Sequence, residues 1–423
     1  MKIAYVTNYL PGYHAHVGGA ERALWDTAAL AKERGTAVFF MVTPFSRITR
    51  ASPVPDNVYA VRTLESVFPF LEKAVQVLKW YVFQFDPVSY RISLRILRKE
   101  RPDIVHAGNM QFLTFSVFAA ARRLRIPVVF SVYDYWCFCP LTTLHDVDQK
   151  PCRTFHGAGC VRCTPRVFRF IQRILLLARK KIFGRFLKKV GRFIVLSESS
   201  AGILESYGIP PAAIRMIRLP LKERPAETVL QDGKVQYVLF MGWLQKRKGL
   251  HILLEAMRRV WEFFPAVKLY AVLQDVRWER PYEREIIRMV DRLPKDKIAV
   301  FKGQRSRQEI DAIIRGARIV VIPEQWENMS PVLLIEAMGM AKPVVASRIG
   351  GVPEFLDDLR EGLLARHDDP EDFFYKISYL LTYRERAEEM GVNARAKIQA
   401  LLEPGAIADQ LDKEYRSWIP QSS

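Results

Sequence analysis

The sequence predicts an α/β protein with two doubly wound domains. Short runs of β-branched and aromatic residues alternate with helix-length segments in both halves of the chain, which is the pattern of parallel βα units. These runs are apolar throughout, as expected for strands that helices cover on both faces. A length of 423 residues also suits two domains better than one.

In the first half, buried strands are expected at 3–7, 37–42, 104–106, 128–132 and 193–196. In the second half they are expected at 237–241, 268–272, 298–301, 319–322 and 344–346. Helices are expected between the strands. The helix at 20–34 should end at Gly35, because glycine readily adopts the conformation that follows a helix. We expect a first domain at 1–217, a second at 218–404 and a final helix in 405–423. The polar segment 222–234 is the expected linker.

The composition indicates a globular protein with an excess of basic residues. The net charge is +19, from 64 basic and 45 acidic side chains, which favours a polyanionic partner. No apolar run reaches about 18 residues, so no transmembrane helix is expected. The N-terminus leads directly into a strand and lacks the apolar stretch of a signal peptide. We therefore expect a cytoplasmic location.

A helix start in the second half suits a phosphate group. Ser330 and Pro331 follow a polar loop and predict the beginning of a helix over 332–340. A serine hydroxyl can cap the free amides of a helix, and proline fits its first turn. These amides and the positive end of the helix dipole favour an anion. An ordinary βαβ unit with a buried, hydrogen-bonded Glu336 would give the same pattern.

At these residues the chain resembles the retaining family-4 glycosyltransferases of the GT-B type. Their E-x7-E motif is followed by EAM, G-x-PVVA and GG-x-PE, and this chain has IEAM at 335–338, KPVVAS at 342–347 and GGVPE at 350–354. The resemblance implies that Glu336 binds the donor ribose. It also implies that the first acid contacts the transferred sugar. Asn328 stands eight residues before Glu336, so either Glu327 or Asn328 takes that role. The implied donor contacts around the helix start are Met329, Ser330 and Val332.

Two glycine loops extend the resemblance. Gly18 and Gly19, in GGAER, are similar to the first-domain loop of the family, which faces the donor phosphates and sugar. In the second domain the family has Gly-Arg-Leu followed by Lys-Gly, whose basic residues bind the diphosphate. The matching positions here are Gly242, Lys248 and Gly249, with Trp243 in place of the arginine. Lys246 and Arg247 are the alternative cations.

Two strand ends in the first half also match. PDIVHA at 102–107 resembles the family's PDVVHAH strand and implies that His106 lies at the cleft. A hydrogen-bonded core histidine is the alternative. The segment 130–136 resembles the family's HDYW turn with Tyr133 in place of histidine, which leaves Asp134 as a polar candidate near the reacting groups.

The resemblance implies two Rossmann-like domains that face an interdomain cleft, with a C-terminal helix that crosses back to the first domain. It also implies a retaining transfer of a sugar from a nucleotide-sugar donor to a lipid-linked or membrane-associated glycan, in cell-envelope polysaccharide or glycolipid synthesis. No catalytic cofactor is expected. Two alternatives remain open: a GT-B nucleotide-sugar epimerase, and a non-catalytic basic binding protein stapled by zinc.

All five cysteines lie between 137 and 163, in the pattern CFC-x12-C-x7-C-x2-C. Cys160 and Cys163 have the spacing of a zinc knuckle, and Cys139 with Cys152 would complete four thiolate ligands. A cytoplasmic protein is not expected to use them as disulfides. An iron–sulfur cluster and thiols without a metal are the alternatives. A subgroup of the same family has a similar cysteine-rich insertion, which supports a common structural role.

A basic amphipathic segment follows the cysteines. Residues 164–192 contain ten Lys or Arg and no acidic residue, and Phe170, Ile174 and Leu177 fall on one stripe beside Arg169 and Arg173. This pattern suits an anionic membrane surface, so we expect peripheral attachment to the inner face of the cytoplasmic membrane. A solvated basic face is the alternative. No nucleic-acid recognition motif accompanies the charge, and nucleic acid is not an expected partner.

Overall fold

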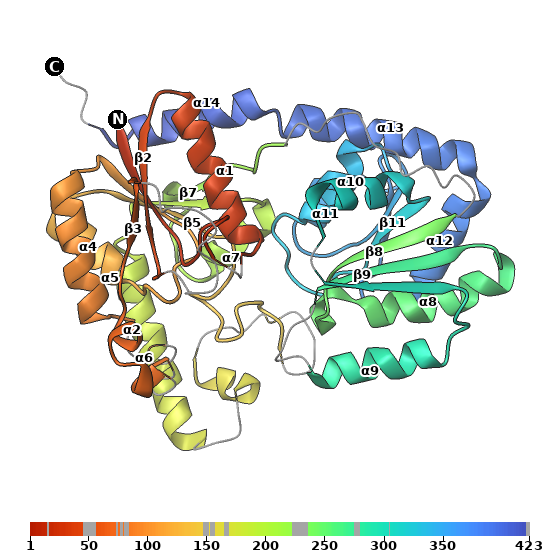
Figure 1. The fold of residues 1–423 in the computed structure, drawn as a ribbon, viewed down its shortest axis with the longest axis horizontal. Coiled ribbons are helices and arrows are strands. Elements are labelled where there is room, and N and C mark those ends of the chain that lie inside the picture. Colours follow the sequence, from red (N-terminus) through yellow and green to blue (C-terminus); the bar gives the residue numbers. More distant parts are fainter. Residues whose placement is uncertain are drawn as a thin grey trace. The chain divides into compact units, whose positions relative to one another are not determined.

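The computed structural model describes residues 1–14, 17–44, 56–72, 75–76, 79, 84–146, 152, 157–164, 169–221, 236–274, 280–303 and 305–419. The described residues before 221 form one compact unit together with those after 403. Residues 236–403, preceded by Leu221, form a second unit. Each unit is a parallel sheet flanked by helices, and each is considered by itself below (Figure 1). The predicted linker, 222–234, lies outside the described residues.

The first unit contains a seven-stranded parallel sheet in the order β3-β2-β1-β4-β5-β6-β7. Its strands are β1 (Lys2–Val6), β2 (Ala37–Val42), β3 (Val58–Ala60), β4 (Ile104–Ala107), β5 (Val128–Ser131), β6 (Arg192–Val195) and β7 (Ile214–Met216). Its helices are α1 (Gly19–Glu33), α2 (Leu64–Val67), α4 (Pro87–Glu100), α5 (Ser116–Arg123), α6 (Arg169–Leu187), α7 (Glu198–Ser206) and α14 (Pro404–Arg416). Three short 3-10 turns join them: η1 (Pro69–Leu71), η2 (Ala158–Cys163) and η3 (Pro211–Ala213).

The second unit contains a six-stranded parallel sheet in the order β10-β9-β8-β11-β12-β13. Its strands are β8 (Tyr237–Trp243), β9 (Lys268–Gln274), β10 (Ile298–Lys302), β11 (Ile319–Ile322), β12 (Val344–Ser347) and β13 (Leu363–Ala365). Its helices are α8 (Leu250–Phe263), α9 (Arg280–Asp291), α10 (Arg307–Gly316), α11 (Val332–Gly339), α12 (Pro370–Thr382) and α13 (Arg384–Leu401). The 3-10 turns η4 (Lys246–Lys248) and η5 (Val352–Glu354) follow β8 and β12.

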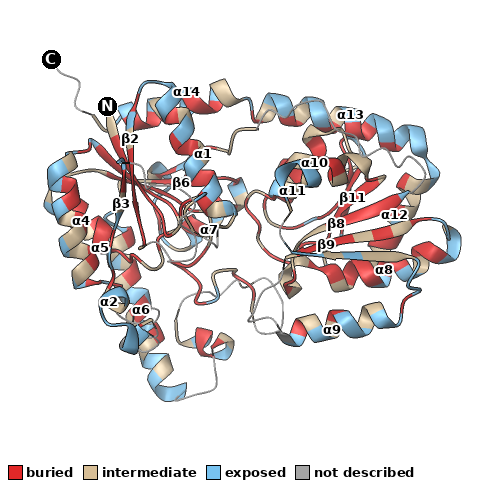
Figure 2. Ribbon diagram, viewed as in Figure 1, coloured by how far each residue is buried: buried red, intermediate tan, exposed pale blue. Residues whose placement is uncertain are grey.

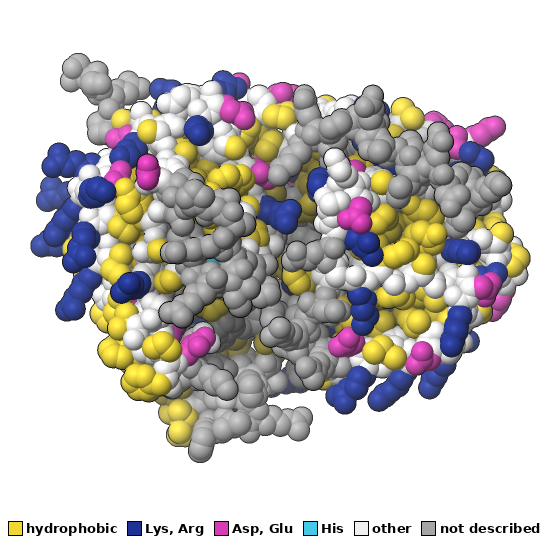
Figure 3. Space-filling model, in the orientation of Figure 1, with side chains coloured by type: hydrophobic (Ala, Val, Ile, Leu, Met, Phe, Trp, Pro, Cys, Tyr) yellow, Lys and Arg dark blue, Asp and Glu magenta, His cyan; other side chains and the backbone are white. Residues whose placement is uncertain are grey.

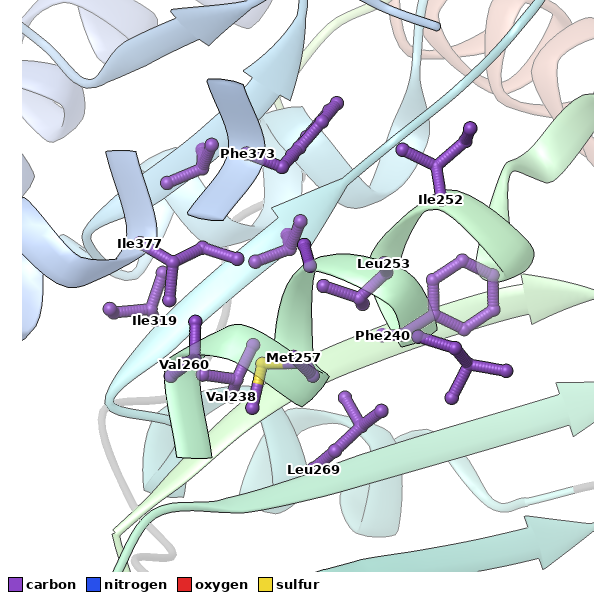
Figure 4. Close-up of a cluster of buried hydrophobic side chains, with 14 of the residues drawn as sticks. Val238, Phe240, Ile252, Leu253, Met257, Val260, Leu269, Ile319, Phe373 and Ile377 are labelled. Atoms are coloured by element: carbon purple, nitrogen blue, oxygen red, sulfur yellow. The ribbon is translucent and has the colours of Figure 1, made fainter. Parts of the chain in front are cut away.

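Both sheets are buried on both faces, while the outer faces of the helices are exposed (Figure 2). In the second unit, the apolar faces of α8 and α12 pack onto the central strands, as Figure 4 shows for Phe240, Leu253, Met257, Phe373 and Ile377. Burial of such side chains contributes roughly 1.5–3 kcal/mol each before the entropy cost of folding. The core therefore fixes the strands whose ends carry the loops discussed below.

The C-terminal helix α14 is anchored to the first sheet by a buried polar cluster. The hydroxyl of Tyr415 lies 2.7 Å from Nδ1 of His106 and 3.1 Å from the hydroxyl of Tyr5. The other ring nitrogen of His106, Nε2, lies 2.7 Å from the hydroxyl of Ser131. Nearby, Arg192 on β6 forms an ion pair of 2.6 Å with Glu414. The four side chains of the cluster are Tyr5, His106, Ser131 and Tyr415, and each has a hydrogen-bond partner, as buried polar groups require.

The expected strands match the structure closely, but three strands were not predicted. β3, β7 and β13 have only three residues each and lie toward the sheet edges, so their apolar pattern is too short to recognise. The helix expected at 20–34 is α1, and the one expected at 332–340 is α11. The predicted cap was wrong: Pro331 is the N-cap of α11, with no side-chain hydrogen bond to the helix amides.

We predict that His106 makes the protein sensitive to acid. Burial lowers the pKa of His106 from 6.5 to about 3. Between these values the unfolded chain binds a proton that the folded chain does not, so this contribution to stability is present above pH 6.5 and is lost as the pH falls toward 3. His106→Gln should flatten the dependence of the unfolding free energy on pH by up to about 1.4 kcal/mol per pH unit. Urea unfolding at pH 6, 5 and 4 measures it, and parallel slopes for the two proteins would contradict it.

Candidate functional site

The strand order of the second sheet reverses between β8 and β11, which are hydrogen-bonded neighbours. In open parallel sheets, ligands bind outside the carboxyl ends of the strands at such a switch point. Here the two loops at this point are 244–249, which leads into α8, and 323–331, which leads into α11. They contain half of the residues that the sequence assigned to the donor: Lys246, Arg247, Lys248, Met329 and Ser330.

A buried carboxylate joins these two loops. Glu324 is 5% exposed and forms an ion pair with the ammonium group of Lys248. Its other oxygen, Oε2, accepts hydrogen bonds from Nε1 of Trp326, at 3.1 Å, and from the side-chain amide of Asn328. A carboxylate that lies out of water needs a cation and hydrogen-bond donors, and these three side chains supply both. The sequence analysis did not select Glu324, although its position directly after β11 and Pro323 was a usable signal.

Two basic residues of η4 lie over the indole ring of Trp326. The guanidinium carbon of Arg247 lies 4.3 Å from the ring centroid, and Nζ of Lys248 lies 5.7 Å from it. The Nε of Arg247 also donates to the side-chain oxygen of Gln245 at 2.9 Å. These contacts hold two cations beside the carboxyl end of β8. Lys246 belongs to the same turn, and Gly242 lies against the aliphatic stem of Lys248.

Two glycines allow the loops to meet. Gly249 has φ of 74°, and a Cβ at this position would lie 1.7 Å from the carbonyl oxygen of Pro323. Gly350, after β12, has φ of 57°, and its Cβ would lie 2.8 Å from the amide nitrogen of Asn328. Only glycine fits such positions without strain. The loops after β8, β11 and β12 therefore converge on the segment 323–328 through backbone contacts.

The helix start predicted to bind an anion is present, with different capping. The side-chain oxygen of Asn328 accepts from the amide of Ser330 at 3.2 Å, so Asn328 rather than Ser330 orders the turn. Within the described residues, the buried hydroxyl of Ser330 has no hydrogen-bond partner. Met329 is buried and Val332 is exposed at the first helical position. The first amides of α11 have no hydrogen-bond partner within the helix, because no helical turn precedes them.

Glu336 lies one turn into α11 and pairs with Arg307 of α10. Nη1 of Arg307 is 2.8 Å from Oε1 of Glu336, and Nε is 3.1 Å from Oδ1 of Asp311. Burial acts to lower the pKa of Arg307, but the attraction of the Glu336 and Asp311 carboxylates outweighs it and raises that pKa. Glu336 is thus held as an acceptor near the helix start, while Asn328 is committed to Glu324 and Ser330. Glu327 is half-buried in the same loop.

In the first unit, Gly18 is the N-cap of α1 and Gly19 is its first residue. The carboxylate of Glu21 folds back over them: Oε2 accepts from the amide of Gly18 at 3.0 Å, and Oε1 accepts from the side chain of Asn109 at 2.9 Å. Burial raises the pKa of Glu21, since its charged form loses water. The glycine loop after β1 is therefore tied to the end of β4.

The two catalytic candidates of the first unit, His106 and Asp134, have different surroundings. His106 is fully buried and its two ring nitrogens contact Tyr415 and Ser131, which favours the core-histidine interpretation that the sequence left open. Asp134 is half-buried after β5, and its carboxylate accepts from the amide of Trp136 at 3.0 Å. This contact orders the turn that Asp134 begins.

The described residues, which include all five cysteines, contain no group of three or more His, Cys, Asp or Glu side chains that could hold a metal ion. The cysteines are thiols outside any disulfide. The predicted zinc site is not supported by this arrangement and stays a prediction from sequence spacing.

Two family models match the chain: "Glycosyl transferases group 1" over residues 223–397, and "Glycosyltransferase Family 4" over residues 17–221. Solved structures of similar fold cover nearly the whole chain. HepE of Anabaena, in complex with UDP and glucose, aligns with a TM-score of 0.70 over 99% of this chain and 100% of its own, at 17% identity. Sucrose-phosphate synthase of Thermosynechococcus elongatus aligns with a TM-score of 0.70 over 98% of both chains, also at 17% identity. The chain belongs to the GT-B glycosyltransferases. The predicted fold of two Rossmann-like domains is thereby confirmed.

Curated relatives agree with this family. Sulfoquinovosyl transferase SQD2 of Arabidopsis thaliana is 25% identical over 402 residues, which are 92% of this chain and 69% of the relative. The D-rhamnosyltransferase WbpZ of Pseudomonas aeruginosa is 25% identical over 68% of this chain and 73% of its own length. Other relatives match over about half of their length, as does the glycosyltransferase MJ1178 of Methanocaldococcus jannaschii, at 28% identity over 45% of its length.

We predict that Gly249→Ala disrupts the site. The new Cβ would collide with the backbone at Pro323 in addition to straining a left-handed residue, and we expect a loss of more than about 3 kcal/mol in unfolding free energy. Gly303→Ala is the matched control: Gly303 has φ of 98°, but among the described residues no atom lies within 4 Å of the added Cβ, so only about 1–2 kcal/mol of backbone strain is expected. Urea unfolding of both variants measures the difference, and equal losses would contradict the predicted loop contact.

Proposed function

We propose that this glycosyltransferase moves a sugar from a nucleotide-sugar donor to a lipid-linked or membrane-associated glycan, in cell-envelope polysaccharide or glycolipid synthesis. The observation that carries the donor assignment is the convergence of three loops at the carboxyl edge of the second sheet. They hold two basic side chains at the loop that leads into α11, and the motif carboxylate Glu336 lies one turn into this helix. Each of these groups suits one part of a nucleoside diphosphate.

The donor's diphosphate would lie at the start of α11. The first amides of this helix, the hydroxyl of Ser330 and the positive dipole end can stabilise its negative charge. Lys248 and Arg247 supply full positive charges to the leaving diphosphate as the sugar bond breaks. Because Glu324 pairs with Lys248, it fixes where that ammonium group lies before a donor arrives. Preorganised charge of this kind acts on the transition state without reorganisation.

The nucleoside would extend toward Glu336, whose carboxylate can accept hydrogen bonds from the ribose hydroxyls. HepE, a protein of the same fold, was crystallised with UDP and with UDP-glucose. For the transferred sugar we propose Glu327 of the two candidates that the sequence left open, because its carboxylate matches the acid of the motif whereas Asn328 carries an amide. We propose retention at the anomeric carbon, on the motif resemblance.

The acceptor proposal is supported by relatives and by an exposed surface. A putative colanic acid biosynthesis glycosyltransferase, WcaL of Salmonella typhimurium, is 24% identical over 51% of this chain. Within the described part of the chain, no helix is both long and apolar enough to span a bilayer. Docking on the surface of the bilayer would bring the site to a membrane-embedded acceptor.

Helix α6 offers such a docking surface. It buries Leu176, Phe183 and Leu187 against its own unit, whereas the opposite face exposes four large apolar side chains, each 48% to 76% exposed: Phe170, Ile171, Ile174 and Leu177. Exposed basic residues continue this face toward the C-terminal end of the helix: Lys181, Arg185 and Lys188. Figure 3 shows hydrophobic side chains gathered where α2 and α6 lie, and basic side chains along α4. Apolar insertion beside basic charge is typical of binding to an anionic bilayer.

We predict that Glu336→Ala lowers the rate of sugar transfer at least a hundredfold without unfolding the chain. The variant loses a donor contact at a half-buried helix surface, so its thermal midpoint should change by only a few degrees. Glu371→Ala, which breaks the ion pair between Glu371 and Arg259 on α8, is the matched control. The assay measures nucleoside diphosphate release from a panel of nucleotide sugars with extracted membrane lipids. A rate within twofold of the wild type would contradict the site, and acceptor-independent isomerisation of the donor would favour an epimerase.

We also predict that the double substitution of Phe170 and Ile174 by Ser weakens binding to anionic vesicles at least tenfold, because two apolar side chains no longer insert. Phe263→Ser is the control, since Phe263 is 63% exposed on α8 of the second unit. Co-sedimentation with phosphatidylcholine vesicles containing one quarter phosphatidylglycerol measures the bound fraction. Equal binding of all three proteins would exclude this face of α6 as the docking surface.

A further inference from the structure

The contact between Arg307 and Glu336 joins the start of one helix to the middle of another. A reciprocal capping box fixes the start of α10: the hydroxyl of Ser306 accepts from the amide of Glu309 at 3.2 Å, and the carboxylate of Glu309 accepts from the amide of Ser306 at 2.7 Å. Arg307 is therefore held at the first helical position. From there its guanidinium reaches Glu336 on α11 at 2.8 Å.

The first turn of a helix is an unfavourable position for an arginine such as Arg307. The N-terminal end of a helix carries partial positive charge, so a cation in the first turn is unfavourable. Two carboxylates compensate for it here: Glu336 on the neighbouring helix and Asp311 one turn further along α10, at 3.1 Å from Nε. Because the guanidinium group is planar, contacts at both Nε and Nη1 fix its orientation as well as its position.

The two partners differ in exposure. The side chain of Arg307 is 46% exposed, whereas that of Glu336 is 11% exposed. Because the guanidinium group of Arg307 is partly in water, solvent screens the pair and limits its contribution to stability. The contact therefore matters more for where the Glu336 carboxylate points than for the stability of the unit. A carboxylate accepts up to about four hydrogen bonds, so it can receive hydroxyl groups in addition to Arg307.

We propose that Arg307 is a positioning residue that holds the Glu336 carboxylate as a fixed acceptor for the two vicinal hydroxyls of a ribose, and thereby makes the site prefer ribonucleotides to deoxyribonucleotides. This inference rests on the proposed function, which places the donor ribose at Glu336. Asp311 assists by orienting the guanidinium group.

Two physical effects support this role. A carboxylate whose direction is already fixed loses less conformational freedom when a ligand binds. A site built to bind a hydroxyl group discriminates strongly against an analogue that lacks it, because its polar groups are then left without partners. Without Arg307, Glu336 loses the contact at Oε1 that helps to set its direction, and the geometry required by two adjacent hydroxyls is less well defined. In addition, the guanidinium charge offsets the repulsion between Glu336 and the donor's diphosphate.

The test is calorimetric titration of the full chain with a ribonucleoside diphosphate and its 2′-deoxy counterpart, starting with UDP and 2′-deoxy-UDP and extending to the other common bases. For the wild type we expect the ribonucleotide to bind at least about tenfold more tightly. Arg307→Met should reduce this ratio of affinities to below about threefold, mainly because the ribonucleotide binds more weakly. Arg307→Lys, which keeps the charge but not the planar geometry, should give an intermediate ratio.

Arg259→Met is the matched control, because Arg259 also forms an Arg–Glu ion pair in the second unit and is 41% exposed. It should leave the ratio unchanged, as a merely structural ion pair would. An Arg307→Met variant that keeps the wild-type ratio, or that binds the ribonucleotide more tightly, overturns the proposal. A wild-type ratio that also survives in Glu336→Ala shows that the ribose lies elsewhere. If no nucleoside diphosphate binds the wild type, the proposed function fails and this inference fails with it.

Discussion

The site depends on the buried carboxylate of Glu324. This group sits directly after β11, receives the charge of Lys248 from the loop after β8, and orders its own loop through Trp326 and Asn328. A charge placed out of water is unfavourable unless its partners are complete, so the two loops must keep this arrangement or leave an ion unpaired. The ion pair thus fixes a cation and a helix start relative to each other, which is what recognition of a diphosphate requires.

Glycine makes this arrangement possible. The loops that contact one another leave three strands of the sheet, and at Gly249 and Gly350 their backbones approach more closely than any side chain would permit. In the sequence, Gly350 stands out only as part of the GGVPE motif at 350–354. The structure shows that Gly350 approaches Asn328, so its effect on a ligand is indirect. The sheet core below, packed by α8 and α12, supplies the rigid support.

Much of this could be predicted because the information is local. Continuous apolar runs identified the central strands, and the resemblance of short motifs to those of a known family pointed to Gly242, Lys248 and Glu336. What could not be predicted depends on contacts between distant segments. Glu324 is one acidic residue in a polar loop until the fold brings Lys248 to it. Likewise, nothing in the sequence around His106 shows that its partner is Tyr415, which lies 309 residues away. The cysteine spacing suggested four ligands, but spacing does not determine whether the thiols converge.

The most direct test of the central claim is a crystal structure of the chain with UDP, the nucleotide found with HepE. The account predicts a diphosphate within hydrogen-bonding distance of the first amides of α11 and of Lys248, with the ribose hydroxyls on Glu336. A diphosphate bound away from α11, or a Glu336 carboxylate that still contacts only protein groups in the complex, would contradict it.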